Sequence, residues 1–330
     1  MTYSYFMSNP GRFFTIHYLL FLLFVFSISC HAQAPQQASS PNPQKIIIDT
    51  DIGDDIDDAF AVALALRSPE VQILGISTTF GDVETRAKLL DRLLGEAGHE
   101  DIPVTVGVYD PKIQTNFSQR AYAEGGHFAR KSHPQAVDFI LDQIRKNPGE
   151  ITLVTIGALG NVGAMIDKDP QAFRELKRVV MMGGSIYRGY GDLGYTKPHG
   201  PDPEWNVKLD VPSMRKLLAS GVPVFIMPLD STQLKLDEVK RAIVFKAATS
   251  LTNQLTLLYH EWGQETPTLF DAMTIAFIDK PELCPVTPMR IVVDDKGFTR
   301  PTAGVPNAQV CLDSDPELFF RFYIPRVIEK

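Results

Sequence analysis

The sequence predicts an α/β protein with an open, doubly wound, mostly parallel sheet that has helices on both faces. Three observations support this fold class. Short apolar runs recur without polar alternation, which is typical of strands buried on both faces. Amphipathic helical segments lie between most of these runs. The chain has 330 residues, of which 44% are hydrophobic, so it can bury one large core of this kind.

The predicted strands and helices alternate from Lys45 onward. Strands are expected at 45–50, 71–78, 102–107, 151–156, 177–182 and 223–228. Helices are expected at 57–67, 84–97, 135–146 and 211–220. This alternation predicts parallel strands joined by crossover helices. The last third is more helical, with one short strand expected at 289–293.

The first 44 residues are predicted to lie outside this fold. A charge at Arg12, an apolar run and small residues predict an export signal at 1–32, cleaved after Ala32. Cys30 allows a second interpretation, the acylated cysteine of a lipoprotein, which would attach the protein to a membrane. An uncleaved membrane anchor is a third. Residues 33–44 are rich in Pro, Gln and Ser and predict a disordered linker to a domain at 45–330. We therefore expect an exported protein, periplasmic or secreted.

Charge and cysteine content narrow the function classes. The formal net charge of −7 argues against a nucleic-acid binder, which needs a basic surface, but it does not argue against an uncharged small ligand. Cys284 and Cys311 could form a disulfide in an oxidising compartment or remain buried thiols.

Polar and glycine-rich segments follow the predicted strands at their carboxyl ends. In open α/β sheets, ligands bind at this edge. The segments lie at 51–58, 78–82, 156–161, 182–185 and 229–232. We expect the active site there.

The most acidic of these segments predicts a metal site. Six of the ten residues from 49 to 58 are Asp, and carboxylates this dense repel one another and are costly to bury unpaired. Oxygen ligands without nearby His or Cys point to Ca²⁺ or Mg²⁺, and a flexible, many-carboxylate site favours Ca²⁺. Helix capping, for example by Asp57, is the alternative, but it accounts for one or two Asp only. An EF-hand is excluded because Gly53 and Phe60 stand at its fifth and twelfth positions, where it needs Gly sixth and Glu twelfth. An aspartyl-phosphate phosphatase shares only the initial Asp-x-Asp.

The segment 49–59, DTDIGDDIDDA, resembles the signature of the inosine–uridine-preferring nucleoside hydrolases. Further family-like segments follow in order at 156–161, 181–184, 204–210, 229–232 and 270–272, so the resemblance spans about 46–280. It implies a nucleoside hydrolase-like fold with a Rossmann-like core. It also implies calcium-dependent hydrolysis of ribonucleosides to free base and ribose, in a dimer or tetramer.

The same resemblance implies a role for individual residues. Asp51 would act as the general base on a water held by the metal. The implied metal ligands are Asp51, Asp58, Asp271 and the backbone carbonyl of Ile156. The residues implied to contact the ribose are Asp57, Met182, Glu204 and Asn206. The competing structural interpretations are a surface turn for Glu204 and Asn206, and a helix N-cap for Asp271.

The chain departs from the family pattern in three places. Two extra residues precede the Asp-Asp-Ala end of the acidic segment, so Asp55 is an alternative to Asp57 as the residue that faces the sugar. Asp82 stands where an Asn that touches the ribose is common, and we expect it to bind substrate. Phe270 stands where members often carry a His that protonates the leaving base. The histidines that could replace it are His127, His133, His199 and His260.

Three functions follow from these observations. The first is a ribonucleoside hydrolase. The second is a nucleoside- or riboside-binding protein with weak or no turnover, because Phe270 removes the acid. The third is a hydrolase of another riboside. Trp262 and Tyr259 could stack on a base or serve in ordinary helix packing.

Overall fold

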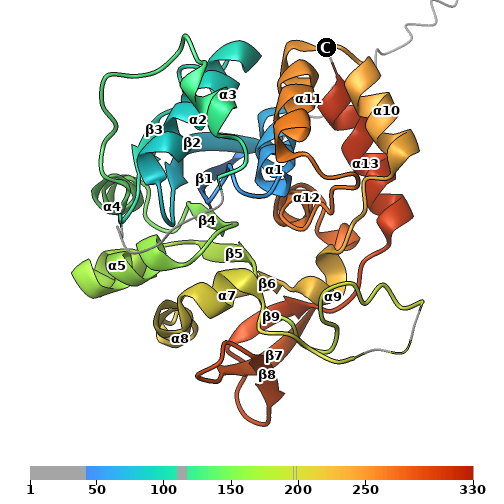
Figure 1. Cartoon of the computed structure of the whole chain (residues 1–330). Helices are drawn as coiled ribbons and strands as arrows, with labels where there is room; N and C mark the ends of the chain where they lie inside the picture. The colour runs from blue at the N-terminus through green and yellow to red at the C-terminus, as the bar shows by residue number, and fades with distance from the viewer. Residues whose placement is uncertain (1–41, 110–116, 196, 198, 330) are drawn as a thin grey trace, which may run out of the picture. The chain divides into compact units, whose positions relative to one another are not determined.

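The apolar runs of the sequence form the parallel part of one mixed sheet. The computed structural model describes residues 42–109, 117–195, 197 and 199–329, so the predicted signal segment and most of the predicted linker lie outside the described residues. Within the described part the sheet has nine strands in the order β3-β2-β1-β4-β5-β6-β9-β7-β8 (Figure 1). The parallel strands are β1 (Gln44–Thr50), β2 (Val71–Thr78), β3 (Val104–Val106), β4 (Thr152–Thr155), β5 (Arg178–Met182) and β6 (Val224–Met227). The predicted fold class is confirmed.

The far edge of the sheet differs most from the prediction. There β9 (Ala308–Cys311) pairs in parallel with β6, while β7 (Val286–Val293) runs antiparallel to β9 and to β8 (Thr299–Thr302). Of these three strands the sequence predicted only part of β7. Strands β8 and β9 have four residues each, which is too few for a period to be recognised. At the other edge β3 is shorter than the predicted 102–107. In the middle of the sheet β1 begins at Gln44, the last residue of the predicted linker.

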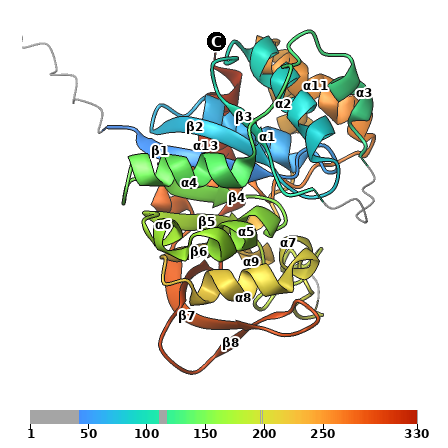
Figure 2. The same cartoon turned by 90° about the vertical axis from the view of Figure 1, so that its left-hand side faces the viewer.

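Two sets of helices cover the two faces of the sheet. Because side chains alternate along a strand, Ile47 of β1 joins one apolar core while Ile46 and Ile48 join the other. The core with Ile47 includes side chains of α4 (Ala136–Lys146), α5 (Gly160–Lys168), α6 (Pro170–Arg174) and α8 (Val211–Ala219), which lie in front of the sheet in Figure 2. The opposite core includes side chains of α1 (Asp57–Leu66), α2 (Val83–Ala97), α11 (Ser250–Trp262), α12 (Ala272–Asp279) and α13 (Pro316–Ile328).

Shorter helices complete the described chain. They are α3 (Arg120–Glu124), α7 (Trp205–Leu209), α9 (Leu229–Thr232) and α10 (Glu238–Lys246), with a 3₁₀ turn at Pro281–Leu283. Within the described residues, every helix is too short or too polar to cross a bilayer.

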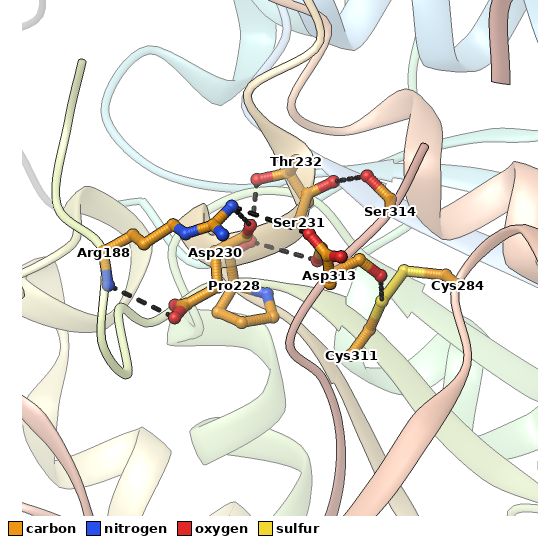
Figure 3. Close-up of a disulfide and its surroundings, with 9 residues drawn as sticks. All are labelled: Arg188, Pro228, Asp230, Ser231, Thr232, Cys284, Cys311, Asp313 and Ser314. Atoms are coloured by element: carbon orange, nitrogen blue, oxygen red, sulfur yellow. Dashed lines mark hydrogen bonds and ion pairs between the residues drawn. A yellow bond between two sulfur atoms is a disulfide. The ribbon is translucent and has the colours of Figure 1, made fainter. Parts of the chain in front are cut away.

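A disulfide joins Cys284 to Cys311, with the two Cα atoms 5.6 Å apart. It connects the residue two before β7 to the last residue of β9, beside α9 (Figure 3). Of the two alternatives left open by the sequence, the structure selects the disulfide.

The strand order also fixes where a ligand site can form. β1 and β4 are neighbours, and the chain winds from them in opposite directions, through β2 and β3 on one side and through β5 and β6 on the other. Such a switch point leaves a crevice at the carboxyl ends of the two strands. Asp51 follows β1 directly, and Ile156 follows β4 directly.

Candidate active site

A cavity of about 780 Å³ lies at this switch point. Its lining divides into two chemical groups. Eight carboxylates line it: Asp51, Asp54, Asp55, Asp57, Asp58, Asp202, Glu204 and Asp271. Five aromatic side chains also line it: Phe80, Tyr190, Trp205, Trp262 and Phe270. The cavity thus combines a strongly acidic surface with flat apolar groups.

Three of the carboxylates form a cluster that could hold a metal ion. Asp57 and Asp58 open α1, and Asp271 precedes α12; one oxygen from each lies within 4.8 Å of the others. All three are buried. Burial and mutual repulsion raise the pKa of each carboxyl well above its usual range. A cation would relieve this repulsion, and the oxygen-only donors suit a hard divalent ion.

Helix capping does not explain this cluster. The residue before α1 is Ile56, and it makes no side-chain cap bond. Asp271 occupies the N-cap position of α12, but its carboxylate accepts no cap bond either. Asp57 stands in the first turn of α1 and Asp271 at the N-cap position of α12, but capping bonds do not account for either carboxylate.

Asp51 lies on the cavity wall, outside the group of three. Burial raises the pKa of its carboxyl to about 6, and the charge of Arg86 opposes the rise. Arg86 is fully buried and donates to the carbonyls of Asp51 and Ile52 and to the Asp54 carboxylate, the last at 3.0 Å. The buried guanidinium of Arg86 thus supports the acidic loop, and the sequence analysis did not predict this role. A single Arg on the buried face of amphipathic α2 was the available signal.

The ends of β1 and β4 are held together beneath the cavity. The amide N–H of Ile156 donates to the carbonyl of Asp49 at 2.8 Å. The Asn161 side chain donates to the Asp49 carboxylate at 2.7 Å and to the carbonyl of Thr78 at 3.0 Å. Ile156, predicted to offer its carbonyl to the metal, lines the cavity.

The predicted ribose contacts Met182, Glu204 and Asn206 also line the cavity. Glu204 is only 1% exposed, so the surface-turn alternative is wrong. Its carboxylate caps α7, accepting the N–H groups of Gly184 at 2.8 Å, Asn206 at 2.9 Å and Val207 at 3.2 Å. Burial nevertheless raises the pKa of Glu204 to about 7. The Asn206 amide donates to the carbonyl of Met182 at 3.2 Å, which fixes these residues as one unit.

The two extra residues of the acidic loop lie at the cavity as well. Asp55 and Asp57 both line it, but Asp55 is exposed whereas Asp57 is buried in the carboxylate cluster. The structure therefore places Asp57 at the floor and Asp55 nearer the mouth.

Asp82 is the one predicted site residue that does not line the cavity. It is the N-cap of α2, where its carboxylate accepts the N–H and the hydroxyl of Thr85 at 3.1 and 2.8 Å. Arg120 forms an ion pair with it at 3.0 Å. Its oxygens are engaged by these partners, and the cavity lining gives no support to the expectation that Asp82 binds substrate, which stays a prediction.

No described histidine replaces the missing imidazole. Phe270 lines the cavity, whereas His127, His133, His199 and His260 do not. His133 bonds to Asp91 at 3.0 Å, and His199 bonds to the carbonyl of Tyr190 at 3.1 Å. Of the two aromatic candidates, Trp262 lines the cavity, whereas Tyr259 packs against Phe245 with ring centroids 5.2 Å apart.

Comparisons with known proteins identify the family. The family model of the inosine-uridine preferring nucleoside hydrolases matches residues 46–321. An uncharacterized protein of Schizosaccharomyces pombe is 32% identical over 262 residues, which cover 72% of this chain and 81% of that protein. A pyrimidine-specific ribonucleoside hydrolase of Salmonella arizonae is 31% identical over 306 residues, which cover 83% of this chain and 95% of that enzyme.

Solved structures share the fold. A plant nucleoside hydrolase superposes with a TM-score of 0.75 at 23% identity, covering 87% of this chain and 100% of the other. A purine-preferring ribonucleoside hydrolase from Gardnerella vaginalis superposes with a TM-score of 0.74 at 23% identity, covering 86% and 98%. From the sheet, the acidic cavity and these matches together, we conclude that this chain belongs to the inosine-uridine preferring nucleoside hydrolases, a family of N-glycosyl hydrolases.

Proposed function

We propose that this protein hydrolyses the N-glycosidic bond of ribonucleosides to free base and ribose, with Ca²⁺ as its cofactor. The observation that carries the proposal is one cavity that combines a floor of buried carboxylates, Asp51, Asp57, Asp58, Glu204 and Asp271, with aromatic side chains, of which Tyr190 and Trp205 are exposed. A ribose offers hydroxyl groups that carboxylates accept, and a base offers a flat face that aromatic rings stack against. The floor therefore suits the sugar and the aromatic surface suits the base.

The calcium ligands follow from the predicted set and the observed cluster. Asp58 and Asp271 belong to both, so we assign them as the central ligands. Asp51 and the carbonyl of Ile156 face the same cavity and complete the set. Asp57 is the third member of the cluster, and we assign it to hold ribose hydroxyls beside the ion. A bound Ca²⁺ supplies positive charge that neutralises the cluster and lowers the pKa of a neighbouring water.

The chain's own carboxylates perform the remaining steps. Asp51 lines the cavity beside the carboxylate cluster and accepts a proton from the attacking water. Loss of the base leaves positive charge on the sugar, and the surrounding carboxylates stabilise that charge. Glu204 and Asn206 orient the sugar because their backbone partners hold them in place.

A nucleoside-binding protein without turnover is the second candidate. Phe270 favours it, because no imidazole lines the cavity among the described residues. General acid catalysis contributes about a hundred- to ten-thousandfold, so its loss slows hydrolysis without abolishing it.

The experiment uses the chain from Gln33 onward with a panel of ribonucleosides and calcium. Free base and reducing sugar are measured for the wild type, for Asp51→Ala and for a chelator-treated sample. We expect base release that both treatments reduce by at least a hundredfold and that added calcium restores after chelation. Tight binding of intact nucleosides without release would replace the hydrolase proposal with the binding protein. Release only from other ribosides would replace it with the third function.

We further propose that the protein is exported and assembles as a dimer or tetramer. The basis is the N-terminal pattern of residues 1–32 for export and the family resemblance for assembly. Mass spectrometry of the native protein would show whether the chain begins after Ala32 or carries a lipid at Cys30, and light scattering would give the mass of the assembly.

A further inference from the structure

Departure of a base places negative charge on its nitrogen, and that charge needs a hydrogen-bond donor. An ionised carboxylate accepts hydrogen bonds and donates none, so the carboxylates that line the cavity do not supply this donor. The donors among the described lining residues are Tyr190, Trp205, Asn206, Lys208, Trp262 and Gln264. Asn206 is engaged with Met182 at the floor, and Trp262 is a buried side chain that lies beside Asp55. The remaining side-chain donors are Tyr190, Trp205, Lys208 and Gln264.

Tyr190 differs from the other three because its side chain is held from two sides. Its hydroxyl oxygen accepts the backbone N–H of Trp205 at 3.0 Å. Its ring lies edge-on to Phe270, with centroids 6.1 Å apart and an interplanar angle of 82°. Trp205, Lys208 and Gln264 are exposed and have no side-chain hydrogen bond to other described residues. A donor that is already oriented stabilises developing charge without reorganising during the reaction.

The proton of the Tyr190 hydroxyl is not engaged. The hydroxyl acts as an acceptor toward Trp205, and it donates to no acceptor within the described residues. Tyr190 is 41% exposed, whereas the floor residues are buried, so it lies nearer the mouth of the cavity, on the aromatic surface that we assign to the base. Phe270, next to Asp271 in the chain, has no proton to give, and the phenol lies directly against it.

We propose that the Tyr190 hydroxyl donates a hydrogen bond to the departing base, in place of the imidazole that Phe270 lacks. The bond from C1′ to the base nitrogen breaks, and its electron pair stays on that nitrogen, toward which the O–H points. The water oxygen forms the new bond to C1′, and Asp51 takes one of its protons. The base then takes a proton from solvent and Asp51 returns one to solvent, so the phenol stays neutral throughout.

The environment of the phenol agrees with a neutral donor. Burial and the nearby charges of Glu204 and Asp57 raise the pKa of Tyr190 above its ordinary value. The hydroxyl therefore keeps its proton throughout the neutral range.

The test rests on the proposed function and compares two kinds of leaving group. Inosine and uridine lose a base that needs a donor, whereas p-nitrophenyl β-D-ribofuranoside loses a stable phenolate that needs none. For Tyr190→Phe we expect kcat/KM for the nucleosides to fall about a hundredfold, as for loss of one oxyanion donor. We expect kcat/KM for the p-nitrophenyl riboside to stay within about twofold, which also shows that the variant is folded.

Two control variants make the result specific. Tyr187→Phe changes an exposed tyrosine of the same loop that does not line the cavity, and we expect it to match the wild type on both substrates. Lys208→Met removes a rival donor. An equal loss on both substrates for Tyr190→Phe would overturn the proposal in favour of a sugar contact. No loss for Tyr190→Phe, or a selective loss for Lys208→Met alone, would overturn it as well. If the wild type hydrolyses no riboside at all, the proposed function fails instead.

Discussion

At the scale of single residues, the function of a carboxylate depends on what already occupies its oxygens. The Asp82 carboxylate accepts from Thr85 twice and from Arg120, so little of it remains for a ligand. Asp57 and Asp271 lie in a buried cluster of acids. The main causes of their raised pKa are burial and the charges of neighbouring carboxylates, and no basic side chain is among the main causes. The first arrangement stabilises a helix, and the second destabilises the protein until positive charge is supplied.

Asp82→Ala tests this distinction. We expect the free energy of unfolding to fall by about 1 kcal/mol because α2 loses its N-cap. We expect kcat/KM for nucleosides to change less than about twofold because the side chain does not line the cavity. Urea denaturation and steady-state kinetics on the same preparation give both values. A tenfold rise in KM at unchanged stability would return Asp82 to the substrate site.

At the scale of elements, the loop after β5 carries Tyr190 and leads to Glu204. One residue of α9 holds its start: the Asp230 carboxylate accepts the N–H groups of Ile186 at 2.8 Å, Tyr187 at 2.8 Å and Arg188 at 3.2 Å. The Arg188 side chain in turn reaches the carbonyl of Asp230 (Figure 3). The loop is therefore shaped by an element that follows it by more than forty residues.

Asp230→Ala tests whether this anchor positions the substrate site. We expect three unsatisfied N–H groups to lower the free energy of unfolding by about 2–4 kcal/mol, since each buried orphan costs roughly 1–3 kcal/mol and the loop relaxes in part. We also expect KM for nucleosides to rise more than kcat falls, because Asp230 touches the loop and not the cavity. Asp230→Asn keeps one acceptor oxygen and should lie between the wild type and Asp230→Ala. Equal stability of all three proteins would contradict the anchoring role.

At the scale of the whole molecule, the fold buries acids at the switch point of its sheet. Asp49 is one of them: burial and the charge of Asp51 raise its pKa to about 7, and the bond from Asn161 opposes the rise. In the unfolded chain the same carboxyl has a pKa of 3.8. The contribution of Asp49 to stability is thus fully present below pH 3.8 and is lost as pH rises to about 7.

Asp49→Asn tests this linkage in chelator-treated protein. We expect the free energy of unfolding of the variant, relative to the wild type, to increase from pH 5 to pH 8. Between pH 5 and pH 8 the gain has an upper limit of about 2.7 kcal/mol, because about two of the roughly three units of pKa shift are expressed in this range. Urea denaturation at several pH values measures this gain. Asp82→Ala serves as a control because it removes a carboxyl that is only half-buried. A difference that does not change with pH would contradict the raised pKa.

Much of the architecture could be predicted because it depends on local patterns. Continuous apolar strands separated by amphipathic helices determined the parallel sheet and its two helical layers. The short strands β8 and β9 could not be predicted, since four residues show no period and the pairing partners lie elsewhere in the chain.

The sequence by itself determined the doubly wound sheet and the acidic loop at its edge, and nine of the ten site residues that it predicted line the cavity. Only the tertiary structure decided that Asp82 is engaged by Arg120, that Arg86 supports the acidic loop and that Tyr190 lies against Phe270. The physical reason is that composition and periodicity report which side chains must be buried. Which oxygens and protons remain free for a ligand depends on partners tens of residues away, and only the folded chain brings those partners together.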